Sequence, residues 1–334
     1  MIIIFVSMKR ISIVFFIIFL LISSCFGINC RSNGFLDSFD GISEETDYIF
    51  KDSLINAVLQ SISTDTVQQI IIDMENFKTR FALAENRRDI AVWLKNRFIN
   101  AGYDNVVLDS FYVEIERHTV VLKTWQYNVV ARLEGKTDTD KKYILGAHYD
   151  SINYMNDDFD APGADDNASG IAAVLEVARV FKQHQISPKY NITFVCFAAE
   201  EIDKMGSTYY AEKLSEQNVN VALMINNDMI AYNPDNKKQW KFNVQKYPGT
   251  ERFIEIIENI AHNYTVLKPV TTTGFLNHSD SYPFHLQGYK AVFFNEYTFN
   301  NNIHTFFDII DNLDIDYCTE IIKISGGLLL EENL

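Results

Sequence analysis

From Asn105 onward the chain alternates short apolar segments with helical ones. Apolar runs at residues 143–147, 192–199 and 221–227 predict strands, and each is followed along the chain by apolar residues at helical spacing. The runs are nearly continuous, as is typical of strands that helices cover on both faces. The alternation predicts an α/β fold with a mixed, largely parallel central sheet flanked by helices.

The other segments fit the same plan. Helices are predicted at 54–63, 89–102, 170–184, 206–217, 250–264 and 312–332, with further strands at 125–135 and 289–297. Hydrophobic residues make up 47% of the chain and aromatic residues 13%, which is typical of a folded globular protein and not of a disordered one. We therefore expect a single domain over residues 51–334.

The N-terminus has the layout of an export signal. Residues 1–27 contain a basic pair, Lys9 and Arg10, then an apolar run over 11–22 and then small residues. The stretch ISSC also resembles a bacterial lipobox, in which Cys25 would be lipidated. A lipoprotein, a cleaved soluble form and an uncleaved anchor remain open, and each implies an exported protein: secreted, periplasmic or membrane-anchored.

Charge and cysteine content exclude several classes of protein. The net charge of −15 argues against a nucleic-acid partner, which would require a basic face. The four cysteines contain no CxxC pair for a zinc site and are too sparse for a disulfide scaffold. Residues 28–50 are polar and rich in turn-forming residues, so we interpret them as a spacer.

Polar residues directly follow three of the predicted strands. They are His148, Asp150, Glu200, Glu201 and Asp228. Because ligands bind at the carboxyl ends of strands in open α/β sheets, these side chains are expected at one crevice. Several carboxylates at one edge would repel each other, and a divalent cation such as zinc removes that repulsion.

The stretch PGADDNASG over residues 162–170 has two readings. Asp, Asn and Ser commonly accept hydrogen bonds from free N–H groups at a helix start, so the stretch fits a helix cap. Alternatively, Asp165 or Asp166 would be a metal ligand held at a tight turn, although the stretch taken alone favours the cap. The nine residues alone leave both readings open.

Five motifs in order resemble those of the M28 family of zinc aminopeptidases. They are GAHYDS, PGADDNASG, AAEE followed by MGS, NNDM, and IHTFFD, and the resemblance covers roughly residues 55–330. It implies a zinc exopeptidase-like three-layer fold, two co-catalytic zinc ions per chain, and peptide substrates with a free N-terminus.

The resemblance also implies a role for each site residue. His148 and Asp228 would bind one zinc ion, Glu201 and His304 the other, and Asp166 would bridge the two. Two such ions acidify a water molecule and polarise the scissile carbonyl.

Two further residues would assist the ions. Asp150 would orient the ring of His148, and Glu200 would act as general base and then as acid toward the leaving amine. The carbonyl-polarising residue is left open, with Tyr282 and Tyr297 as candidates. Asp165 is either a second acid near the metals or a cap.

Two rival functions accompany this interpretation. The first is a glutaminyl cyclase, a single-zinc acyltransferase on the same fold, whose members depart from the ADDNASG pattern. The second is a non-catalytic binding ectodomain, which would lose ligands. Ser279-Asp280-Ser281 departs from the Ser-Asp-His of many relatives, and Asp308 follows the IHT motif as a further possible partner.

Overall fold

The computed structural model describes residues 37–117, 120–137, 141–155, 159–234 and 240–334. The chain divides into two units, residues 1–52 and 53–334. The described part of the first unit is helical, because helix α2 begins at Asp37. This helix differs from the turn-rich spacer that composition indicated over 28–50. The export signal predicted at residues 1–27 lies outside the described residues.

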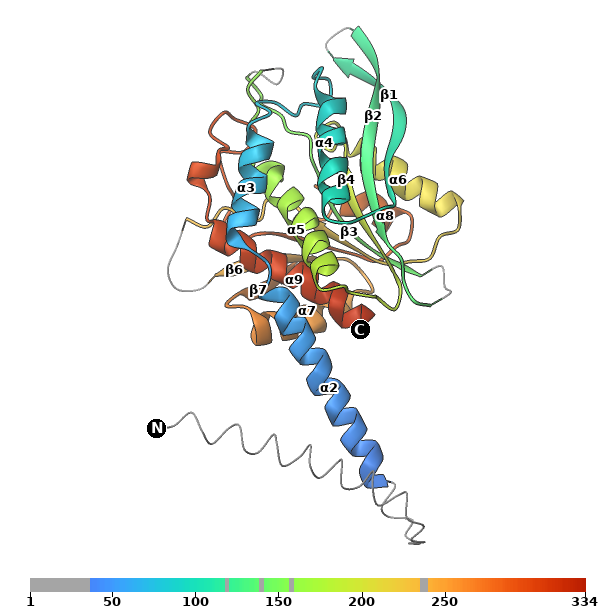
Figure 1. Ribbon diagram of the computed structural model, residues 1–334. Helices are drawn as coiled ribbons and strands as arrows, with labels where there is room; N and C mark the ends of the chain where they lie inside the picture. Colours follow the sequence, from blue (N-terminus) through green and yellow to red (C-terminus); the bar gives the residue numbers. More distant parts are fainter. Residues whose placement is uncertain (1–36, 118–119, 138–140, 156–158, 235–239) are drawn as a thin grey trace, which may run out of the picture. The chain divides into compact units, whose positions relative to one another are not determined.

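Helices and strands alternate along the second unit (Figure 1). The α-helices are α2 (Asp37–Leu59), α3 (Thr64–Glu75), α4 (Arg87–Asn100), α5 (Gly170–Gln183), α6 (Met205–Glu216), α7 (Glu251–Tyr264), α8 (Ser281–Leu286) and α9 (Ile315–Asn333). Short helices are η1 (Ala164–Ser169) and η2 (Ile310–Asn312). The strands are β1 (Val106–Arg117), β2 (Val120–Leu133), β3 (Lys142–His148), β4 (Asn191–Phe197), β5 (Val221–Asn227), β6 (Lys241–Lys246), β7 (Lys268–Thr272) and β8 (Ala291–Glu296).

The strands form one eight-stranded sheet in the order β1-β2-β4-β3-β5-β8-β6-β7. Its centre is parallel, because β3 pairs in parallel with both β4 and β5, and β5 with β8. The hairpin β1–β2 lies antiparallel to β4, and β6 lies antiparallel to β8. The predicted mixed, largely parallel sheet is confirmed.

Helices cover both faces of this sheet and give three layers (Figure 1). On one face α4 and α5 pack on the strands, and α3 and α9 pack next to α5. α6 and α8 pack together on the opposite face, over a smaller apolar cluster that includes Tyr210 and Phe284. Within the described residues, none of the helices combines the length and apolar character needed to cross a membrane.

Local sequence signals account for several helix ends. The hydroxyl of Ser63 accepts a hydrogen bond from Thr66 N at 3.3 Å and begins α3. Asp314 caps α9 in the same way, accepting from Tyr317 N at 3.1 Å. Gly102, which we predicted to end a helix, has a φ of +94° just after α4.

The three strands without a sequence prediction are β1, β6 and β7. β1 is an edge strand in which charged residues interrupt the apolar pattern, and β6 and β7 are short and polar. Their pairing is set by neighbouring strands and not by a strong local pattern.

Gly206 provides a test of how tightly the turn between β4 and α6 is packed. A Cβ atom there would lie 2.2 Å from the carbonyl oxygen of Ala198 and 2.5 Å from Asn128 Oδ1. We expect Gly206→Ala to destabilise the protein by about 1–3 kcal/mol, because backbone must move to admit the methyl group. Gly274→Ala is the control, since its Cβ would meet nothing closer than 3.8 Å. Equal unfolding free energies for the two variants in urea would contradict this packing.

Candidate metal centre

The predicted site residues lie at the carboxyl ends of four adjacent parallel strands. They are His148 and Asp150 after β3, Glu200 and Glu201 after β4, Asp228 after β5, and His304 after β8. Asp166 reaches the same edge from η1, between β3 and α5. Because neighbouring parallel strands end at the same edge, residues more than 150 positions apart in sequence converge there.

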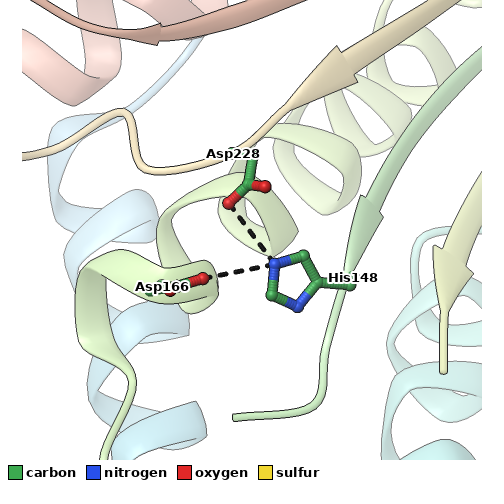
Figure 2. Close-up of side chains that lie close together, drawn as sticks. All are labelled: His148, Asp166 and Asp228. Carbon is green, nitrogen blue, oxygen red and sulfur yellow. Dashed lines mark hydrogen bonds and ion pairs between the residues drawn. The ribbon is translucent and has the colours of Figure 1, made fainter. Parts of the chain in front are cut away.

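The first group of possible ligands is centred on His148 (Figure 2). Its Nε2 lies 3.2 Å from Asp166 Oδ1 and 3.3 Å from Asp228 Oδ1. The ring is buried, with only 1% of the side chain exposed. Figure 2 shows both carboxylates pointing toward the same ring nitrogen.

The second group is centred on His304. Its Nε2 lies 3.0 Å from Asp166 Oδ2 and 3.0 Å from Glu201 Oε2. Asp166 therefore presents one carboxylate oxygen to each imidazole and belongs to both groups. A shared carboxylate of this kind is suited to bridging two metal ions.

The donor set fits divalent metal ions. In each group the ligand atoms lie within 4.8 Å of one another. Glu201 Oε1 is buried and has no hydrogen-bond partner among the described residues, so this ligand carboxylate keeps one uncompensated acceptor. Imidazole nitrogen with carboxylate oxygen is a donor set that zinc favours.

The electrostatics of these groups also indicate a cation site. Burial lowers the pKa of His148, but contact with Asp228, Asp150 and Asp166 outweighs it and holds this pKa well above the usual range. Burial also lowers the pKa of His304, but the hydrogen bonds that His304 donates to Asp166 and Glu201 outweigh it and raise this pKa to about 12. Protons on the two rings thus provide positive charge that metal ions would otherwise bring.

Asp150 holds the strand ends in place. Its Oδ1 lies 3.5 Å from His148 Nδ1 and accepts a hydrogen bond of 2.9 Å from Glu200 N. Its Oδ2 accepts one of 3.1 Å from Glu201 N. One buried carboxylate thus contacts a histidine and the backbone of two acids from the next strand, and its predicted role in orienting His148 stays a prediction.

Several residues around the site have a left-handed backbone. Ala199, directly before Glu200, has φ 56°, and Met229, directly after Asp228, has φ 57°. His304 itself has φ 56°. Positive φ is costly for residues other than glycine, and such residues concentrate at functional sites.

Sequence reasoning missed Arg80, which is buried beneath the site. Its guanidinium donates hydrogen bonds to Tyr149 O at 2.8 Å, Pro162 O at 2.5 Å and Gly163 O at 2.7 Å. Burial lowers its pKa to about 10, so it stays cationic at neutral pH, and Asp308 is its strongest opposing charge. No motif marks Arg80, because its partners are backbone atoms of distant loops.

Asp308, considered only as a further partner in the sequence, holds the turn that contains Asp166. Its Oδ1 accepts from Asp165 N at 2.9 Å and its Oδ2 from Asp166 N at 3.0 Å. In addition its backbone oxygen accepts from Ala164 N at 3.0 Å. The IHTFFD motif therefore supplies both His304 and the support of the shared carboxylate.

The two readings of PGADDNASG can now be assigned to different residues. Asn167 Oδ1 accepts from Gly170 N at 2.9 Å, so the helix-start role belongs to Asn167. Asp165 belongs to neither ligand group and accepts from Ala231 N and from Asn300 Nδ2, both at 2.9 Å. Ser169 Oγ donates to Asp165 O at 2.7 Å and accepts from Ile230 N at 3.1 Å, linking the turn to the segment after β5.

A cavity of about 480 Å³ opens directly onto the ligand groups. Its polar floor is Asp166, Glu200, Glu201, Asp228 and His304, and its apolar wall is Met229, Phe275, Phe293, Phe299 and Ile303. Tyr154, His278, Asn295 and Asn301 complete the lining. The tyrosines considered from the sequence, Tyr282 and Tyr297, do not belong to the described lining.

Fold and site together define an α/β protein with two adjoining groups that could hold divalent metal ions at a sheet edge, as in the class of zinc-dependent exopeptidases. Residues 128–327, more than half of the chain, match the model of peptidase family M28. The chain belongs to this family, and the resemblance found in its motifs is confirmed.

Two fungal relatives are similar over different lengths. A probable zinc metalloprotease of Pyrenophora teres f. teres is 32% identical over 57% of this chain and 43% of that protein. The chain thus spans less than half of this relative's length. Leucine aminopeptidase 1 of Paracoccidioides brasiliensis is 26% identical over 83% of this chain and 73% of that protein.

Solved structures share the fold. The Legionella pneumophila LapA aminopeptidase superposes with a TM-score of 0.69 at 23% identity, covering 83% of this chain and 74% of that one. A Bacteroides thetaiotaomicron glutaminyl cyclase gives 0.65 at 18%, covering 81% and 99%. The predicted zinc exopeptidase-like fold is confirmed, and at these identities the likeness concerns the fold alone.

The raised pKa values predict how the metal-free protein responds to pH. Burial raises the pKa of Glu201 to about 8, that of Asp308 to about 8 and that of Asp280 to about 7. Carboxyl groups of the unfolded chain release their protons near about pH 4. Between about pH 4 and about pH 8 the folded state therefore binds more protons than the unfolded state, so the free energy of unfolding falls as pH rises.

We expect the melting temperature of the metal-stripped protein to fall between about pH 5 and about pH 8. Zinc added at about pH 8 should raise it more than zinc added at about pH 5, because the ions replace protons that have left. Thermal melts across this range, with and without a chelator, measure both effects. A metal-free protein that becomes more stable toward pH 8 would contradict the assignment.

Proposed function

We propose that this chain is an exported metallo-aminopeptidase that hydrolyses the N-terminal peptide bond of peptides with two zinc ions. The observation that supports this most directly is the shared carboxylate of Asp166. It contacts His148 at 3.2 Å and His304 at 3.0 Å, and so links two ligand groups at the floor of one cavity. Export is proposed from the signal-like residues 1–27 alone.

His148 and Asp228 would hold one ion, Glu201 and His304 the other, with Asp166 between them. Bound there, the ions would activate water and polarise the substrate carbonyl. The close approach of ring nitrogens to carboxylate oxygens, with each imidazole between two acids, supports this partition.

Glu200 is suited to be the proton carrier. It lines the cavity, is 8% exposed, and is fixed by the hydrogen bond from its own N–H to Asp150. Burial, with neighbouring acids, raises its pKa well above the usual range. A carboxylate of raised pKa takes a proton from water more readily and can return it to the leaving amine.

The cavity favours substrates with an apolar first residue. Its wall carries three phenylalanines together with Met229 and Ile303, while its acids gather at the floor. A cationic α-amino group would be attracted to that floor, and an apolar side chain would be buried against the wall. The name of one relative, leucine aminopeptidase, agrees with this preference.

A glutaminyl cyclase is the rival that a specific observation favours, because a solved cyclase shares the fold over 81% of this chain. Such a single-zinc enzyme would need one ligand group. Two groups joined by Asp166 favour the peptidase.

A panel of aminoacyl-anilides together with an N-terminal glutaminyl peptide tests the class of enzyme. We expect hydrolysis of the leucyl and phenylalanyl anilides to exceed that of the glutamyl and lysyl anilides by at least about 10-fold in kcat/KM, with no cyclisation of the peptide. Elemental analysis should find close to two zinc ions per chain. Cyclisation with one tightly held ion would favour the cyclase, and neither activity would favour a binding domain.

Glu200→Gln tests the proton carrier. The variant keeps the shape and the hydrogen bond from its own N–H, but the amide cannot take a proton. We expect kcat to fall by at least about 100-fold while zinc content stays unchanged. Glu216→Gln, at the exposed end of α6, is the matched control and should behave as the wild type. Normal turnover by Glu200→Gln would remove this residue from the mechanism.

A further inference from the structure

The two histidines of the site differ in what their second ring nitrogen contacts. His148 Nδ1 faces the buried carboxylate of Asp150 at 3.5 Å and its backbone oxygen at 3.2 Å. His304 Nδ1 instead faces the phenolic oxygen of Tyr154 at 2.6 Å. At His304, a hydroxyl from an exposed loop thus occupies the position that the carboxylate of Asp150 has at His148.

Three contacts join Tyr154 to His304. Beside the hydrogen bond to Nδ1, the two rings pack edge to face, with centroids 4.8 Å apart and planes at 78°. The backbone N–H of Tyr154 also donates to the carbonyl oxygen of His304 at 3.1 Å. Tyr154 therefore holds both the side chain and the left-handed backbone of His304, whose φ is 56°.

The neighbours of His304 determine which nitrogen carries its proton in the metal-bound state. Nε2 faces Asp166 and Glu201, so a metal ion between these acids would take the Nε2 lone pair. Nδ1 must then carry the hydrogen and donate it to the hydroxyl oxygen of Tyr154. Without that acceptor, either nitrogen could carry the proton and the ring could rotate on its loop.

We propose that Tyr154 is the positioning residue of the second metal site, fixing His304 as an Nε2 ligand through its hydroxyl oxygen. The statement that His304 binds a metal ion rests on the proposed function, whereas the contacts between Tyr154 and His304 are independent of it. Tyr154 is 76% exposed, so replacing it leaves no cavity in the core. It also lines the substrate cavity, where a shift of His304 would displace the bound ion relative to Glu200.

Tyr154→Phe separates the hydroxyl from the ring, and Tyr154→Ala removes both. Tyr112→Phe is the control, because this tyrosine of β1 is also exposed and does not belong to the described cavity lining. The measurement is the release of zinc from the loaded enzyme to a coloured chelator, with thermal melts as a check of folding.

We expect Tyr154→Phe to release one ion per chain about 10–100-fold faster than the wild type, with the other ion unchanged. With zinc in excess, kcat should fall by at least about 10-fold while KM changes less than about threefold. Tyr112→Phe should match the wild type in both measurements.

Zinc release from Tyr154→Phe at the wild-type rate would overturn the proposal. Faster release from Tyr154→Ala but not from Tyr154→Phe would also overturn it, because ring packing without the hydroxyl would then be enough to position His304. A wild type that binds two ions but hydrolyses no anilide would reject the proposed function and leave this test intact. A wild type that holds no ion would reject both.

Discussion

The shared carboxylate of Asp166 is the interaction on which the rest of the site depends. It is buried, yet hydrogen bonds and charge from His148 and His304 overcome that burial and hold its pKa below the usual range. An ionised group at this depth is stable only beside positive charge. The turn that carries it is fixed through its own backbone, since Asp308 binds the N–H groups of Asp165 and Asp166. The acids at the ends of these strands can therefore remain close together at one edge of the sheet.

Arg80 supplies a second source of positive charge near these acids. It is 1% exposed and binds the carbonyl oxygens of Tyr149 and of the turn before Asp166, which brings one permanent cation under a cluster of acids. A buried arginine alone would be destabilising, but this guanidinium donates hydrogen bonds to carbonyl oxygens and interacts with the charge of nearby carboxylates such as Asp308. This cation attracts the nearby acids independently of any metal ion.

Site residues that a local sequence pattern marks could be predicted from the sequence. Residues held only by contacts with distant parts of the chain could not. His148, the acid pair at 200–201 and Asp228 each follow an apolar strand directly, and parallel pairing of four strands brings them to one edge. Arg80 has no such marker, because it binds backbone atoms up to 83 residues away in the chain. Tyr154 was missed for the same reason: its partner lies 150 residues away, and nothing in SINYMND distinguishes it from a surface aromatic. The helix that begins at Asp37 was missed because its composition is polar.

The two ligand groups also differ in how deeply their histidines are buried. His148 lies on a buried strand end, 1% exposed, while the side chain of His304 is 18% exposed on a loop. The cavity lining includes Asp166, Asp228, Glu201 and His304 but not His148, so a substrate would meet acids of both groups and the imidazole of the second group only. Ligand-binding segments are commonly drawn from the less densely packed parts of a fold. The parallel strands provide the buried half of the site, and the loop after β8, which contacts Tyr154, provides the more exposed half.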